Sequence, residues 1–115
     1  MMRRVMFAAT LLVACQAWGK GVAVDSGDAA ARMAARITQD YGLSTDKTEC
    51  LLFDTADKGD YFLVRVREKH TDTCGGEPDV SPVLFFLKLR KRDGHAVTTA
   101  YDGEHYRPLK PQHAK

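Results

Sequence analysis

The residues of this chain that could do chemistry are, first, its three cysteines. Cys50 and Cys74 lie in the body of the sequence, and Cys15 lies in an apolar N-terminal run. Neither Cys50 nor Cys74 belongs to a Cys-x-x-Cys motif or begins a predicted helix, so a reactive thiol is not expected. The first 19 residues predict export, as argued below, and in an exported chain a lone pair of cysteines is most simply a disulfide. We therefore predict a Cys50–Cys74 bond, which closes a loop of about 25 residues and stabilises the fold by roughly 3–4 kcal/mol.

The four histidines form no recognisable metal or catalytic set. None has a second ligand at metal-binding spacing on one predicted element, although Asp102, Glu104 and His105 cluster near the C-terminus. No nucleophile elbow, phosphate-binding loop or other catalytic signature occurs. We predict no enzyme, metal or cofactor, and rank a small hydrolase last among the alternatives. The histidines are His70, His95, His105 and His113.

The first 19 residues have the order of a secretory signal peptide. Residues 1–4 are positively charged, residues 5–14 are apolar and uncharged, and small or polar residues follow. This apolar run is too short to span a bilayer as a helix. Ala17-x-Gly19 suits ordinary signal peptidase, whereas residues 12–15 resemble a bacterial lipobox, which would make Cys15 a lipidated first residue. We expect a periplasmic or secreted protein, attached to a membrane only if Cys15 carries that lipid.

Charge and length limit the classes of function. The full chain has 17 Lys and Arg residues against 15 Asp and Glu, and two of the arginines lie in the signal segment, so the mature chain is near neutral. A nucleic-acid-binding domain would be basic. A mature chain of about 95 residues supports one modest core and one domain.

One helix is expected over residues 29–41. Asp28 is a suitable N-cap, and Gly42 supplies the left-handed residue at which a helix commonly ends. The apolar residues recur at helical spacing and form one stripe. They are Ala30, Met33, Ala34, Ile37 and Tyr41.

Four strands are expected after the helix, over residues 50–53, 61–69, 83–90 and 96–101. Asp93-Gly94 favours a hairpin turn before the last strand. The two central strands alternate, which gives each an inward apolar face. These inward residues are Phe62, Val64, Val66, Val83, Phe85, Leu87 and Leu89.

The predicted fold is α+β, with one N-terminal helix packed on an antiparallel meander of about four strands and one disulfide. Residues 20–27 are expected to be a linker, residues 28–106 the single domain, and residues 107–115 a loose tail.

One stretch has a family-like pattern, from His70 through Cys74-Gly75-Gly76-Glu77-Pro78 and Ser81-Pro82 into Leu84-Phe85. With the element order, it resembles small helix-on-sheet domains of bacterial envelopes, including cystatin-like and PepSY-like folds and periplasmic inhibitor or immunity proteins. The resemblance covers most of the mature chain and implies an exported binding protein. No functional residue carries over from it.

The 71–82 loop is the first candidate binding site. It has about a dozen residues without predicted secondary structure, a length more often functional or disordered than merely connecting, and its disulfide and prolines oppose disorder. The disulfide and prolines stiffen it, which reduces the entropy lost on binding. Alternatively, its glycines only let the backbone turn near the disulfide. The candidate partner-binding residues are His70, Asp72, Gly75, Gly76, Glu77, Pro78 and Pro82.

The second face of the two central strands is the other candidate. It combines aromatic, aliphatic and cationic side chains, of which aromatic residues and arginine are enriched in interface hot spots. Such a face could dock an acidic partner or pair two copies of the domain. Alternatively, it is an ordinary solvated face covered by amphipathic stems. The residues are Tyr61, Leu63, Arg65, Arg67, Phe86, Lys88 and Arg90.

The sequence thus favours an exported envelope protein that binds another protein and is not an enzyme. An inhibitor or immunity protein against a cell-wall-degrading enzyme is the concrete version. The alternative is a small-ligand or metal-binding module, with its ligand held between helix and sheet or at His95 and His105. No nucleic-acid partner is expected, and the oligomeric state is left open.

Overall fold

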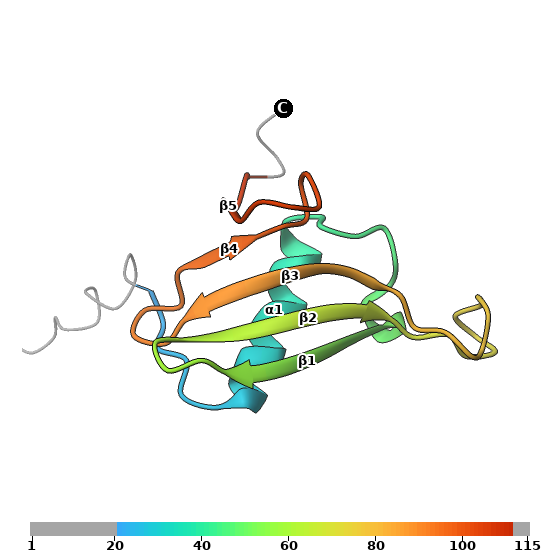
Figure 1. Ribbon diagram of the computed structural model, residues 1–115, viewed down its shortest axis with the longest axis horizontal. Coiled ribbons are helices and arrows are strands. Elements are labelled where there is room, and N and C mark those ends of the chain that lie inside the picture. The colour runs from blue at the N-terminus through green and yellow to red at the C-terminus, as the bar shows by residue number, and fades with distance from the viewer. Residues whose placement is uncertain (1–20, 112–115) are drawn as a thin grey trace, which may run out of the picture.

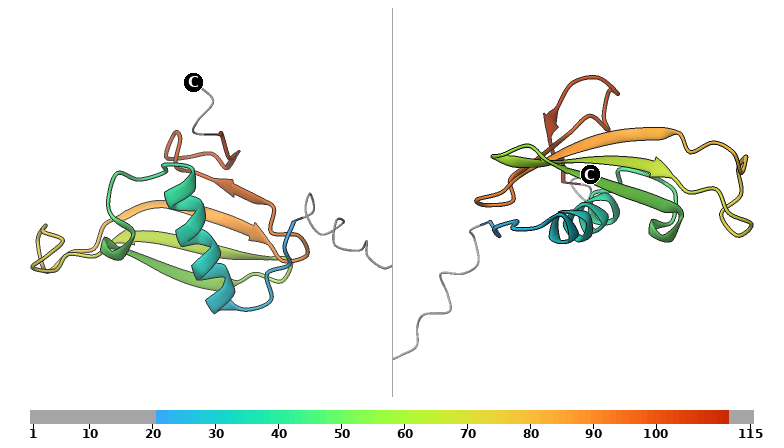
Figure 2. Two further views of the ribbon diagram at one scale, coloured as in Figure 1. Left: turned by 180° about the vertical axis from the view of Figure 1, so that it is seen from behind. Right: turned by 60° about the horizontal axis from the view of Figure 1, so that its bottom comes forward.

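The computed structural model describes residues 21–111. The predicted signal peptide, Cys15 and His113 lie outside these residues. One helix crosses one face of a five-stranded antiparallel sheet, in which each strand pairs with the next along the chain (Figures 1 and 2). The predicted α+β fold is confirmed, with a short fifth strand added to the expected four.

The elements follow each other without crossovers.

No helix within residues 21–111 is long and apolar enough to cross a bilayer. The bounds are α1 Gly27–Asp40, the 3-10 turn η2 Thr48–Cys50, β1 Leu51–Asp57, β2 Tyr61–Glu68, β3 Val83–Arg90, β4 Ala96–Thr98 and β5 Arg107–Pro108.

The ends of α1 are set by hydrogen bonds. Ser26 is the N-cap, and its Oγ accepts from the N–H of Ala29 at 3.0 Å. Asp28, predicted to be the cap, lies instead in the first turn, where a carboxylate complements the helix dipole. Gly42 ends the helix with φ of 62°, as the sequence predicts.

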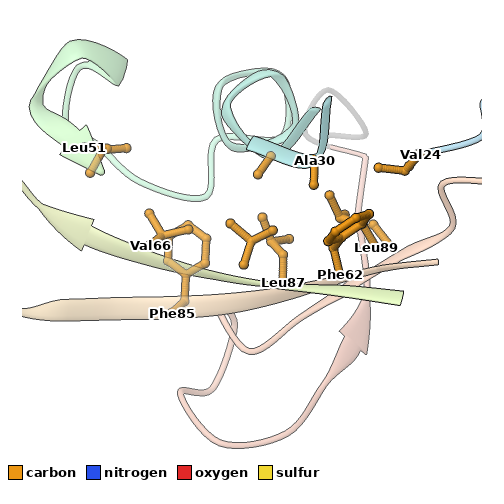
Figure 3. Packing of buried hydrophobic residues seen from close by; sticks show 11 residues of the cluster. Val24, Ala30, Leu51, Phe62, Val66, Phe85, Leu87 and Leu89 are labelled. Atoms are coloured by element: carbon orange, nitrogen blue, oxygen red, sulfur yellow. The ribbon is translucent and has the colours of Figure 1, made fainter. Parts of the chain in front are cut away.

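The core lies between α1 and the inner faces of β2 and β3 (Figure 3). Ala30 and Ala34 face the sheet and are fully buried, and their small side chains let the helix approach closely. The buried apolar residues are Val24, Ala30, Ala34, Leu51, Phe62, Val64, Val66, Phe85, Leu87, Leu89 and Ala96.

Val83, predicted to be in the core, is 45% exposed. The β2–β3 register shifts just before it: Val66 pairs with Phe85, but the next residue, Arg67, pairs with Val83. The extra residue, Leu84, makes a bulge, and beyond a bulge the alternation of faces no longer holds. The strand's first residue therefore points away from the core.

The two ends of the domain are more structured than the sequence predicts. Val24, in the expected linker, is buried, and its N–H donates to the carbonyl of Lys91 at 2.7 Å. Arg107 and Pro108, in the expected tail, form β5 against β4, and Leu109 packs against the core. Each segment has too few apolar residues to produce a periodic pattern.

Candidate partner-binding surfaces

The segment from Lys69 to Pro82, here called the arm, connects β2 to β3. It projects beyond the ends of the strands, away from the body of the sheet (Figure 1, yellow). None of its residues belongs to the buried core between α1 and the sheet. At its base the N–H of Glu68 donates to the carbonyl of Pro82 at 3.0 Å, so the hairpin continues past the strands. Packing in the core therefore does not explain why the arm is ordered.

The predicted disulfide is confirmed and ties the arm to the start of β1. Cys50 and Cys74 are bonded, with their Cα atoms 5.6 Å apart. Beside this bond the N–H of Lys69 donates to the carbonyl of Cys50 at 2.8 Å. One covalent bond and one hydrogen bond therefore hold the arm to the neighbouring strand.

His70 braces the arm from inside. Its Nε2 lies 2.6 Å from Glu68 Oε1, and its Nδ1 lies 2.6 Å from the carbonyl oxygen of Glu77, across the loop. The side chain is only 10% exposed. Both neighbours are acceptors, so the protonated ring donates to both. The Glu68 carboxylate, then the Glu77 carbonyl, raise the pKa of His70 above its ordinary value.

Gly76 covers the His70 ring. A Cβ built at this glycine would lie 2.5 Å from the ring, and its φ of 87° belongs to the left-handed region. Glycine is thus required twice at this position, by conformation and by packing. The sequence predicts that the glycines of the loop let the backbone turn. At Gly76 this accounts for part of the requirement for glycine, and the contact with the His70 ring accounts for the rest.

Ser81 connects the arm to the open face of the sheet. Its Oγ donates to the carbonyl of Glu68 at 2.5 Å and accepts from Arg67 Nη1 at 2.8 Å. Ser81 was quoted in the sequence pattern but not chosen as a site residue. Its contact with an arginine across the bulge could not be read from local sequence.

Residues 71–80 of the arm, here called its tip, are acidic and, apart from Cys74, exposed. Asp72, Glu77 and Asp79 lie on it, and residues 71–82 include no lysine or arginine. Val80 is 48% exposed and adds an apolar side chain between the carboxylates and the base. The predicted loop residues therefore come together as one ordered acidic projection, with His70 inside it.

The open sheet face, defined as the face opposite α1, contains a carboxylate that the sequence analysis missed. Asp54 on β1 accepts from Arg67 Nε at 2.6 Å and from Arg65 Nε at 3.2 Å, both through Oδ2. Hydrogen bonds from Arg67, with its charge and that of Arg65, lower the pKa of Asp54. A longer first strand, with Leu52, Asp54 and Ala56 alternating onto this face, would have revealed it.

The other two predicted cations of this face also have partners. Lys88 Nζ lies 4.2 Å from the ring centre of Tyr106 and 5.3 Å from that of Tyr61. Burial and then Tyr61 raise the pKa of Tyr106, which sequence reasoning also missed. Arg90 forms an ion pair with Asp93 at 2.7 Å. On this half of the open sheet face, the cationic side chains of Lys88 and Arg90 thus already contact other residues of the chain.

The β1 side of the open sheet face keeps a hollow of about 270 Å³. Leu63 and Phe86 supply its apolar surface, and Arg65 lies at its edge with half of its side chain exposed. The lining residues are Asp54, Thr55, Ala56, Leu63, Arg65 and Phe86.

A larger groove, of about 490 Å³, lies between α1 and the β3–β4 turn. Met33, Ile37 and Leu109 line it, and so does His95. His105 lies elsewhere, bonded through Nδ1 to Asp102 at 3.1 Å, so the two histidines do not line the same groove. Among residues 21–111, no three His, Cys, Asp or Glu side chains are placed to hold a metal ion.

Comparison with family models, curated proteins and solved structures found no match to this chain. The resemblance to helix-on-sheet envelope domains therefore stays a prediction, and function is argued from the geometry of these surfaces.

Proposed function

We propose that this protein is a binding module of the cell envelope that acts by inserting the arm into a cleft of another protein. The main support is that a disulfide and the hydrogen bonds of His70 and Ser81 hold the arm in place, although none of its residues belongs to the core. Folding alone does not require such a projection. Binding benefits from it.

Pre-organisation is the physical reason. A flexible loop loses about 0.5–1.5 kcal/mol for each side chain that binding immobilises, and further free energy for its backbone. In this arm the disulfide and the hydrogen bonds already restrict the chain in the folded protein, so less conformational entropy remains to be lost on binding. A rigid narrow projection therefore binds a concave site more tightly than a free loop of the same sequence.

Charge indicates the kind of cleft. Asp72, Glu77 and Asp79 give the tip three carboxylates with no lysine or arginine beside them. A cleft with cationic side chains complements this tip, and opposite charges also speed the encounter. An enzyme that cuts cell-wall polymers has an open elongated cleft, so an inhibitor or immunity protein against such an enzyme is the concrete form of the proposal.

The proposed location is the periplasm or the cell exterior. The predicted signal peptide supports it, and so does the Cys50–Cys74 bond, because disulfides persist in oxidising compartments.

Site-specific photo-crosslinking tests the proposal. A photoreactive amino acid at Asp79, on the tip, is compared with one at Arg32, on the exposed side of α1. Both variants are exported in the native host and irradiated. A discrete adduct from position 79 that is absent from position 32 is expected, and it should weaken when Glu77→Lys is added. No adduct at position 79, or the same adducts at both positions, would overturn the proposal.

An activity measurement tests the inhibitor version. Purified peptidoglycan hydrolases are assayed for lysis of cell walls with and without the protein. Inhibition that is lost on Glu77→Lys, and kept on the matched Glu49→Lys at an exposed position within η2, supports it. Lysis unaffected by excess protein across the hydrolase classes contradicts this version.

The groove supports a second candidate function, small-ligand binding. Its volume of about 490 Å³ lies within the usual range of ligand pockets, and its lining is largely apolar. A ligand that binds only the folded state raises the melting temperature by mass action. A thermal-shift panel of cell-wall fragments, apolar small molecules and metal ions tests this candidate, and no shift at millimolar concentration removes it.

A further inference from the structure

The open sheet face has an uncovered half, and β1 is its outer strand. β1 is the first strand in the sheet order and, within residues 21–111, it pairs with β2 alone. Figure 1 looks onto this face, with α1 behind the sheet and β1 along one edge. An edge strand presents backbone N–H and C=O groups to which another extended segment can add.

Charge on this half is unbalanced. Within residues 21–111, Asp54 is the one carboxylate that accepts from both Arg65 and Arg67, so the cluster has two positive charges and one negative charge. Each of the three Arg67 nitrogens has an acceptor, because Nε and Nη2 donate to Asp54 and Nη1 donates to Ser81. Arg65 reaches Asp54 only through Nε and Nη2, and within residues 21–111 its Nη1 makes no hydrogen bond. Its free donors lie at the edge of the apolar hollow.

We propose that the β1 edge and the adjoining hollow bind an extended segment of the partner protein that has apolar and acidic residues at every second position, so that both lie on one face. One apolar side chain enters the hollow against Leu63 and Phe86, and a flanking carboxylate binds Arg65. This inference rests on the proposed function and adds the chemistry of the partner's second contact. The arm and this site lie on one molecule, so one partner can engage both.

A second copy of the chain fits this edge less well. Antiparallel addition of two β1 strands about their midpoint places Asp54 directly opposite Asp54, and like charges in that position are destabilising. A segment that places its apolar residue opposite Asp54, with its acidic residues two positions to either side, avoids this repulsion.

Capped heptapeptides serve as probes, with backbone amide shifts of the processed, isotope-labelled protein as the readout. The first has the sequence Thr-Glu-Thr-Leu-Thr-Glu-Thr, which places leucine and both glutamates on one side of a strand. The second has lysine for glutamate, and the third has alanine for leucine. The expected result is saturable shifts at residues 54–56, 63–65 and 86 with the first peptide only.

Variants separate charge from fold. Arg65→Gln should weaken binding of the first peptide at least about fivefold, because it removes a charge-assisted hydrogen bond. Arg32→Gln, on the exposed side of α1, is the matched control. Arg67 still pairs with Asp54 in Arg65→Gln, so the fold is kept.

Three outcomes overturn the inference: equal binding of the acidic and basic peptides, shifts confined to the arm or the groove, or full affinity in Arg65→Gln. A concentration-dependent dimer in light scattering that Arg65→Gln abolishes would replace the partner segment with a second copy. If position 79 crosslinks to a partner while no peptide shifts the β1 side, this inference fails and the proposed function stands. If the first peptide shifts the β1 side while position 79 gives no crosslink, the binding role of the arm fails and the site at the β1 edge stands.

Discussion

The imidazole of His70 lies 2.6 Å from the carboxylate of Glu68, and its other nitrogen lies 2.6 Å from the carbonyl oxygen of Glu77. A single ring thus joins the last residue of β2 to the far side of the arm. Only the protonated ring can donate to both acceptors at once. Protonation of His70 and order in the arm are therefore linked.

This linkage predicts a pH dependence. The folded-state pKa of His70 is raised above its unfolded value of about 6.5. Its stabilising contribution is therefore complete below that unfolded value and is lost as pH rises through the folded pKa. Asp46, the other acid that raises it, faces the same ring from the segment before η2. Urea unfolding between pH 5 and 9 should show wild-type stability approaching that of His70→Gln at high pH. A gap that stays constant or widens with pH contradicts the brace.

The Cys50–Cys74 bond should contribute substantially to global stability. A bond between cysteines 24 residues apart is expected to add about 3 kcal/mol by restricting the unfolded chain. Cys50→Ala with Cys74→Ala should therefore lower the free energy of unfolding by about that amount. The control is reductant, which should destabilise the wild type and leave the double variant unchanged. Equal effects of reductant on both proteins would contradict this assignment.

Gly76 and Gly75 should differ on substitution by alanine. Both have positive φ, so each variant carries about 1–2 kcal/mol of backbone strain. At Gly75 the added methyl meets open space, whereas at Gly76 it meets the His70 ring. Gly76→Ala should therefore be the more destabilising, and His70→Ala should relieve the excess in a double-mutant cycle measured by urea unfolding. Equal costs at the two glycines would show that the ring does not pack there.

Val83 and Leu87 test the bulge in β3. Leu87→Ala removes a fully buried side chain and should cost about 2–5 kcal/mol of unfolding free energy. Val83→Ala should cost under about 0.5 kcal/mol, as expected at an exposed position. Thermal unfolding of the two variants provides the comparison. A large loss of unfolding free energy in Val83→Ala would contradict the bulge and would favour the regular alternation that the sequence predicts.

The stabilising contribution of Asp54 should disappear at low pH. Its pKa is lowered in the fold by Arg67, so its stabilising contribution is present above the unfolded pKa, about 3.9, and is lost as pH falls through the folded pKa. Asp54→Asn should cost about 1 kcal/mol at pH 7. It should also bind the acidic heptapeptide more tightly, because it frees both arginines. A decrease in that affinity would show that Asp54 itself holds the segment.

Local pattern predicted the helix, the disulfide, and the inner residues of β2 and β3 with the exception of Val83. These features depend on periodicity and on a cysteine count. The features it missed depend on contacts between segments. Ser26 competes with Asp28 for the cap, and sequence alone does not rank two good capping residues.

The site shows the same division. Chain position identified the arm, because a long loop beside a cysteine is visible in sequence. The His70 brace and the Ser81 bridge depend on how the hairpin closes. Asp54 was missed because the first strand was predicted too short, and Tyr106 because two residues of β5 have no alternating pattern. The open face was therefore predicted to be more basic than it is.

Order in the free arm tests the central claim most directly. Nitrogen-15 relaxation of the oxidised protein without a partner reports the backbone order parameter of each residue on the ps–ns timescale. A pre-organised arm predicts values near 0.85 through residues 70–81, as in the sheet, with a fall at the same residues after reduction of the Cys50–Cys74 bond. Values below about 0.6 in the oxidised arm would contradict the account, because a loop that mobile keeps the entropy that binding must remove.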